Sequence, residues 1–183
     1  MPALKKKITP DEFVELFTER VLEKGQFAEM YEHFSAAVPQ EELSERHFCE
    51  YLMLSFFIDS LCLKWAFHNQ EALSLQALYR ENLLIEVPKR LSGLSCTREL
   101  NDNLEKRFKE YEKAASRIKS VSMNTQATLD SLTALGEAFS KHFVGHENIE
   151  TILKVKWFFL MKEDVLYEKF LKRLGQTYNV TFQ

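Results

Sequence analysis

The segment that most constrains the fold is residues 51–67, YLMLSFFIDSLCLKWAF, which is apolar on almost every side of a helix. Its only charged residues are Asp59 and Lys64. A helix that is hydrophobic all round is buried, either in a membrane or among other helices. This run is too short and too charged to cross a bilayer core of roughly 30 Å. We therefore predict a buried helix that the rest of the chain covers.

Composition favours helices for those remaining segments. The chain has 183 residues, of which 45% are hydrophobic, enough for one globular domain. Five glycines and four prolines are too few for the many tight turns of an all-β fold. The spacing of apolar residues predicts helices at about 10–24, 27–38, 44–68, 71–86, 97–121, 125–143 and 148–175.

These segments predict an all-α, single-domain bundle of about six or seven helices around a buried central helix at about 44–68. The bundle is expected to span residues 9–176. Residues 1–8 are expected to form a flexible basic N-terminal tail, and residues 177–183 a C-terminal tail.

Two local signals bear on the helix boundaries. In ITPDEF, Thr9 suits the N-cap, Pro10 the first helical position and Glu12 the reciprocal capping-box position, so the first helix should begin there. Pro88 should interrupt the fourth helix, because proline lacks the backbone N–H that a helix interior requires. The pattern leaves open whether residues 83–91 are helical.

Charge and cysteine content restrict the possible partners and the compartment. The net charge of −3 is too small to indicate binding to nucleic acid or to an anionic membrane, so we expect neither. Residues 10–45 carry ten acidic and two basic side chains, a local charge of −8, and could dock a basic protein. An ordinary solvated helix surface explains the same pattern.

The odd number of cysteines and the lack of a C-x-x-C motif favour reduced thiols in a cytoplasmic protein.

Known catalytic motifs are absent from the sequence. It contains no glycine-rich phosphate loop, no G-x-S-x-G, no H-E-x-x-H and no Glu-x-x-His pair of the di-iron bundles. We therefore expect no metal and no cofactor, and an enzymatic role is not favoured. His142 and His146 have a spacing that can hold a metal, but Gly145 should end the helix between them.

The sharpest candidate for a ligand site is a row on one face of the predicted helix 44–68. Ser55, Asp59, Cys62 and Ala66 share this face, with Tyr51 or His47 at its mouth. Such a row leaves room for a small ligand or lets another helix pack closely. In the second interpretation Asp59 pairs with a basic residue or a hydrogen-bonding neighbour, because an isolated buried charge is very costly.

Two functional hypotheses follow. The leading one is a non-enzymatic protein that acts through protein–protein contacts, as a homodimer. Its candidate interface is the run 157–161, which is apolar on more sides than one domain covers. The interface residues are Trp157, Phe158, Leu160 and Met161. The alternative is a small-molecule-binding bundle, with or without enzymatic activity, whose pocket lies along the Ser55 row.

Overall fold

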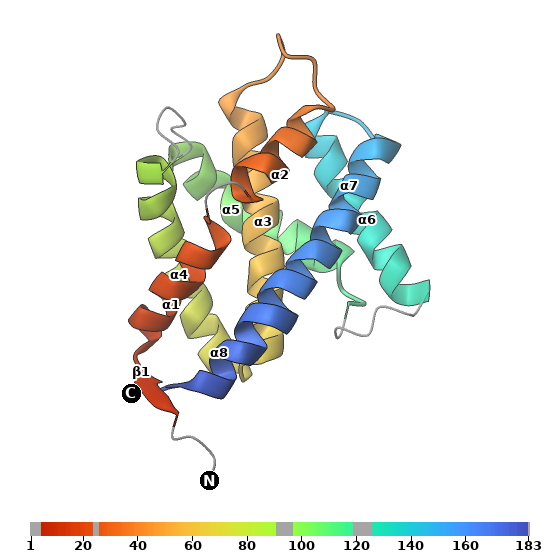
Figure 1. Cartoon of the computed structure of the whole chain (residues 1–183). Helices are drawn as coiled ribbons and strands as arrows, with labels where there is room; N and C mark the ends of the chain where they lie inside the picture. The colour runs from red at the N-terminus through yellow and green to blue at the C-terminus, as the bar shows by residue number, and fades with distance from the viewer. Residues whose placement is uncertain (1–4, 24–25, 91–96, 119–125, 183) are drawn as a thin grey trace.

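The computed structural model describes residues 5–23, 26–90, 97–118 and 126–182. Within these ranges the chain forms seven helices and one pair of three-residue strands (Figure 1). The first six helices are α1 (Pro10–Val21), α2 (Gln26–Ser35), α3 (Glu45–Ala66), α4 (Asn69–Arg90), α5 (Thr97–Ala114) and α6 (Gln126–Phe143). The seventh is a long helix in three parts, α7 (Ile149–Lys162), η1 (Glu163–Leu171) and α8 (Lys172–Thr177). The predicted all-helical bundle is confirmed.

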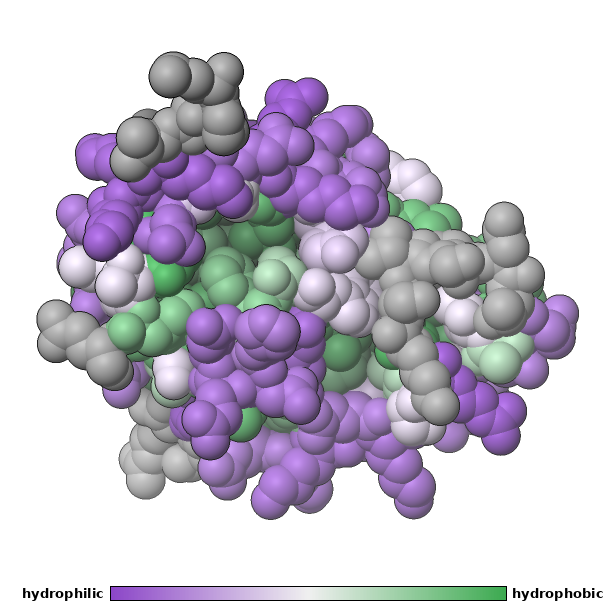
Figure 2. Space-filling model, turned by 90° about the horizontal axis from the view of Figure 1, so that it is seen from below, coloured by the Kyte–Doolittle hydropathy of each residue, from purple (hydrophilic) through white to green (hydrophobic). Residues whose placement is uncertain are grey.

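Helix α3 runs through the middle of the view in Figure 1, with α1 and α4 on one side and α6 and α7 on the other. It packs against α2, α4, α5, α6, α7 and η1. Every residue from 48 to 60 is buried, including the polar Glu50, Ser55, Asp59 and Ser60. Seen from below, hydrophilic side chains frame a hollow in which apolar side chains are visible (Figure 2).

The helix ends follow the local sequence closely. The backbone N–H of Thr9 donates to the Glu12 carboxylate at 2.8 Å, and the Glu12 backbone N–H donates to the Thr9 hydroxyl at 3.2 Å. This capping box, with Pro10 in the first turn, confirms the predicted start of α1. Gly145 has a φ of 84°, the left-handed conformation that glycine adopts readily, and follows the end of α6.

Two helices differ from their predicted course. Pro88 lies inside α4, which continues to Arg90. Leu83 and Val87, which precede Pro88 in α4, are both buried in the hydrophobic core. Their packing holds the C-terminal end of α4 in place. Helix α5 ends at Ala114, earlier than the predicted residue 121.

The long C-terminal helix changes its hydrogen-bond pattern partway. Residues 163–171 form a π-helix, whereas the flanking segments are α-helical. A π segment widens the helix and is common at functional positions. The apolar spacing had indicated one helix over about 148–175 and carried no sign of this change.

Both predicted tails contain ordered strands. Strand β1 (Lys6–Ile8) pairs in parallel with β2 (Tyr178–Val180), with Lys6 opposite Tyr178 and Ile8 opposite Val180. The side chain of Ile8 is buried. Residues 6–8 of the predicted N-terminal tail and residues 178–180 of the predicted C-terminal tail are therefore held by backbone pairing. The pairing joins the two ends of the described chain (Figure 1).

A network of charged groups holds α5 against its neighbours. The Arg107 guanidinium donates from Nε and Nη2 to the Glu50 carboxylate, at distances of 2.9–3.1 Å. The Glu50 side chain is 4% exposed, so this bidentate pair lies inside the protein. Glu110 continues the network to the His142 ring nitrogen at 2.9 Å. The His142 ring therefore has a carboxylate partner on α5.

The cysteines differ from the prediction of three reduced thiols. Cys49 is disulfide-bonded. Cys62 is free and buried. The thiol argument for a cytoplasmic location is therefore weakened. No helix in the described part of the chain is both long and apolar enough to cross a membrane.

Candidate functional site

The predicted row on α3 forms a packed cluster of polar side chains, which we call the Asp59 cluster. Its members are Ser55 and Asp59 from α3, Tyr79 from α4 and Lys162 from the end of α7. The Asp59 carboxylate accepts from the Tyr79 hydroxyl at 2.7 Å and from Lys162 Nζ at 2.8 Å. The Ser55 hydroxyl lies 3.3 Å from Asp59 and 3.1 Å from Lys162 Nζ.

The two charged side chains of this cluster, Asp59 and Lys162, are almost completely buried, which is rare for charged groups. The Asp59 side chain is 0% exposed and the Lys162 side chain 7%. Removing such ions from water costs several kcal/mol each, and mutual attraction offsets this cost only when the remaining hydrogen-bonding groups are also satisfied. Tyr79 and Ser55 supply those additional contacts. The Asp59 cluster thus connects three helices through fully engaged polar groups.

The charge of Asp59 also affects its neighbours. Burial raises the pKa of the Cys62 thiol, and the nearby Asp59 carboxylate raises it further, because a second negative charge is disfavoured there. The same two causes raise the pKa of the Tyr79 hydroxyl. Both groups are therefore held in their neutral forms. A neutral, buried thiol is a poor nucleophile, so this environment does not activate Cys62.

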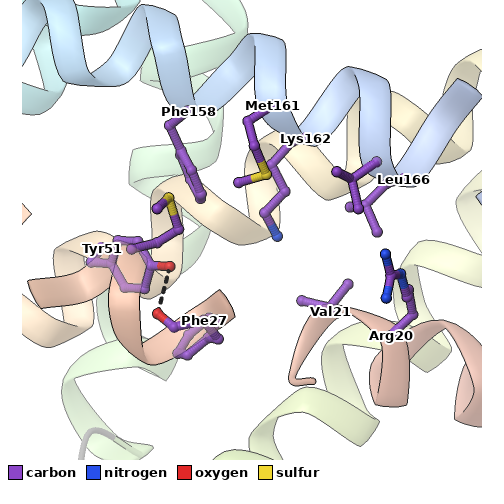
Figure 3. Close-up of a pocket in the computed structure, with 10 residues that line it drawn as sticks. Arg20, Val21, Phe27, Tyr51, Phe158, Met161, Lys162 and Leu166 are labelled. Carbon is purple, nitrogen blue, oxygen red and sulfur yellow. Dashed lines mark hydrogen bonds between the residues drawn. The ribbon is translucent and has the colours of Figure 1, made fainter. Parts of the chain in front are cut away.

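A cavity adjoins the cluster, and Figure 3 shows the side chains that line it. Lys162 and Phe158 reach into it from the long helix, Tyr51 from α3, and Arg20 and Val21 from α1. Its volume is about 20 Å³, which is room for about one water molecule. The cavity is therefore too small for an organic ligand.

The predicted ligand-site residues separate into three groups. Ser55 and Asp59 join the buried cluster, and Cys62 lies close to its charges. Tyr51 lines the small cavity and donates its hydroxyl proton to the Phe27 carbonyl at 3.1 Å. Ala66 is exposed at the end of α3 and belongs to neither place.

His47 has a different environment from the one predicted. Its Nδ1 lies 3.2 Å from the Ser44 backbone nitrogen, which donates to it at the start of α3, and its ring packs edge-on against Phe143. It does not line the small cavity. Its role here is to cap the helix.

The predicted interface residues do not share one face of α7. Trp157 and Leu160 are 48% and 44% exposed, whereas Phe158 is fully buried. Met161 points into the small cavity (Figure 3). Consecutive positions on an α-helix lie about 100° apart, so a continuous run cannot present one surface.

Sequence reasoning missed two members of the Asp59 cluster, Lys162 and Tyr79. The general expectation that Asp59 would have a basic or hydrogen-bonding partner is met by these residues. The sequence does not identify Lys162 as a partner of Asp59, because the two residues are 103 positions apart and only the tertiary fold brings them together. Across the described residues, no three His, Cys, Asp or Glu side chains gather as a metal site requires.

Comparison with known proteins finds no match among protein-family models, curated proteins or solved structures.

Proposed function

We propose that this protein acts through protein–protein contact and forms a homodimer through an exposed apolar surface of α7, which we call the α7 stripe. Four large apolar residues at spacings of four, four and three carry the proposal. Their exposed fractions are 77%, 58%, 48% and 44% for Ile149, Leu153, Trp157 and Leu160, respectively. This spacing places them on one side of the helix.

The size of the stripe suits a modest interface. Its four side chains expose on the order of 400 Å², comparable with the largest apolar patch of a typical monomer, which is often functional. A stable interface buries about 800 Å² on each partner. Neighbouring residues therefore have to contribute, and His33 of α2, whose ring lies 5.6 Å from that of Trp157, is close enough to do so. We expect a dissociation constant in the micromolar range.

Local charge favours a second copy over a strongly charged partner. Beside the stripe, Glu150 and Lys154 pair with each other at 2.7 Å, so neither adds an unpaired charge to its edge. A two-fold contact brings the same patch of both copies together, and it needs no net charge difference. With the axis near the middle of the stripe, Ile149 of one copy approaches Leu160 of the other.

Other predictions receive less support from the geometry. The Asp59 cluster is packed, so it does not favour the small-molecule pocket predicted along Ser55, Asp59, Cys62 and Ala66. Docking of a basic protein on the acidic surface at 10–45 stays a prediction, as do the cytoplasmic location and the absence of nucleic-acid or membrane binding.

Sedimentation velocity with a matched pair of variants tests the homodimer. Leu153→Glu places a charge in the stripe, and Leu73→Glu places the same charge on α4, where Leu73 is 59% exposed. The parent protein and Leu73→Glu should both show a dimer that grows with concentration, whereas Leu153→Glu should remain monomeric. A monomeric parent at several hundred micromolar, or equal association of both variants, would contradict the proposal.

A further inference from the structure

Besides the small cavity next to Lys162, the surface has a hollow of about 460 Å³ between α1 and the C-terminal part of the long helix. This volume is in the range of small-molecule sites. Its residues come from α1, η1, α8 and β2. They include three cationic and three apolar side chains, namely Arg20, Lys169 and Arg173 with Val165, Phe170 and Leu174.

The hollow concentrates positive charge, because no acidic side chain in the described part of the chain lines it. Arg20 pairs with Glu23, and Lys169 pairs with Asp164 at 2.5 Å, but both acidic partners are more than half exposed. Exposed ion pairs contribute only about 0–1 kcal/mol, so a ligand anion can replace them at little cost. Arg173 has no acidic partner among the described residues.

Apolar side chains line the rest of the hollow and can contact the apolar part of a ligand. Leu174 is 8% exposed, and Phe170 packs against Phe17 of α1 with 6.3 Å between ring centroids. Three of the lining residues, Val165, Lys169 and Phe170, belong to the π-helix η1. Arg20 and Val165 also line the small cavity beside Lys162, so the two spaces adjoin.

We propose that this hollow binds a small anion with an apolar body, such as a medium-chain carboxylate or alkyl phosphate. The anionic head lies among Arg20, Lys169 and Arg173, and the apolar body lies against Val165, Phe170 and Leu174. A guanidinium donates two parallel hydrogen bonds to a carboxylate or phosphate, which gives Arg173 the leading role. This site is separate from the α7 stripe and does not depend on dimer formation.

Calorimetric titration of the full chain tests the site with four named probes below their micelle-forming concentrations. Decanoate and decyl phosphate carry both features, whereas decanol lacks the charge and inorganic phosphate lacks the apolar body. Saturable binding of decanoate or decyl phosphate, with much weaker binding of decanol and inorganic phosphate, is expected. The relative affinity of the first two probes identifies the preferred head group.

A neighbouring pair of variants locates the site. Arg173→Gln should weaken binding of the favoured probe about tenfold, or ~1.4 kcal/mol. Lys172→Gln removes the same charge one residue away, from a side chain that pairs with Glu168 and does not line the hollow, and should change the affinity less than twofold. Circular dichroism checks that both variants are folded. Absence of saturable binding, equal weakening by both variants, or binding only to vesicles of anionic phospholipid would overturn the proposal.

Discussion

Asp59 and Lys162, 103 residues apart in the sequence, form an ion pair of 2.8 Å that is almost closed to solvent. Helix α3 supplies the acid and the last residue of α7 supplies the base, directly before the π-helix begins. This pair fixes the position of the long helix against α3, and so the direction in which the α7 stripe faces outward.

Loss of one partner from this pair should be costly. Lys162→Met keeps most of the side-chain volume but leaves Asp59 without its counter-ion. The free energy of unfolding, measured by urea denaturation, should fall by about 3–5 kcal/mol. Lys154→Met is the control, because Lys154 is also buried but pairs with Glu150, whose side chain is 64% exposed. This control should lose only about 0–1 kcal/mol.

A double variant separates loss of the ion pair from loss of packing. Asp59→Asn combined with Lys162→Met removes both charges and keeps groups that can hydrogen-bond to Tyr79 and Ser55. It should recover most of the stability that Lys162→Met loses. A double variant as unstable as the single one would show that packing of the lysine, and not its charge, holds the helices together.

Glu163 should produce a pH-dependent loss of stability. Its side chain is mostly buried, and desolvation raises the carboxyl pKa above the ordinary value of 4.5. Neighbouring Glu168 and Asp164 raise it further. Because the folded-state pKa is the higher one, the contribution of this group to stability is complete below about pH 4.5 and is lost as the pH rises through the folded-state value.

Glu163→Gln tests this effect, because glutamine does not ionise. The variant should be more stable than the parent at pH 7, and the difference should disappear as the pH falls below 4.5. Urea denaturation across this pH range measures it, with Glu147→Gln as the control, because the Glu147 side chain is 56% exposed and does not affect the pKa of Glu163. A stability difference that is the same at every pH would contradict the assignment.

Close packing of α6 against α7 depends on Gly136. A Cβ atom at this position would lie 2.9 Å from Ile152 Cγ2 and 3.0 Å from its Cα. Gly136→Ala should therefore destabilise the protein by about 1–3 kcal/mol, although alanine is the better helix former. Gly175→Ala adds a Cβ that would have no packing neighbour within 4 Å among the described residues, so it should instead stabilise the protein by about 0.4–1 kcal/mol. The same sign for both variants in thermal denaturation would contradict the packing argument.

Thiol titration checks the state of the cysteines. The chain has three cysteines, of which Cys49 is disulfide-bonded and Cys62 is free. Without reductant, the denatured Cys62→Ser variant should react with one equivalent less of a disulfide reagent than the denatured parent, and Cys49 should not react in either protein. In the native parent the reaction should be slow, because Cys62 is buried and its thiol pKa is raised. Three rapidly reacting thiols would contradict both assignments.

Local signals predicted the helices well because they act over a few residues. The Thr9 and Glu12 capping box is one example, and the apolar run of α3 is another. Contacts that depend on the tertiary fold had no such signal. The sequence indicated that Asp59 needed a partner, but not that Lys162 would meet it, and the parallel pairing of residues 6–8 with 178–180 joins segments too short to be recognised.

The α7 stripe could have been found from the sequence. Ile149, Leu153, Trp157 and Leu160 follow helical spacing, whereas the predicted interface followed the continuous run at 157–161. Helical geometry turns Phe158 and Met161 inward, and only Trp157 and Leu160 of that prediction belong to the stripe.

The most direct measurement of the central claim follows Trp157 itself. The chain contains two tryptophans, so Trp65→Phe leaves Trp157 as the only reporter. Acrylamide quenching of its fluorescence lifetime should weaken as the protein concentration rises from about 1 μM to several hundred μM, because a second copy then covers the stripe. Addition of Leu153→Glu should abolish this change. Quenching that is independent of concentration would show that Trp157 stays exposed and that α7 does not form the dimer contact.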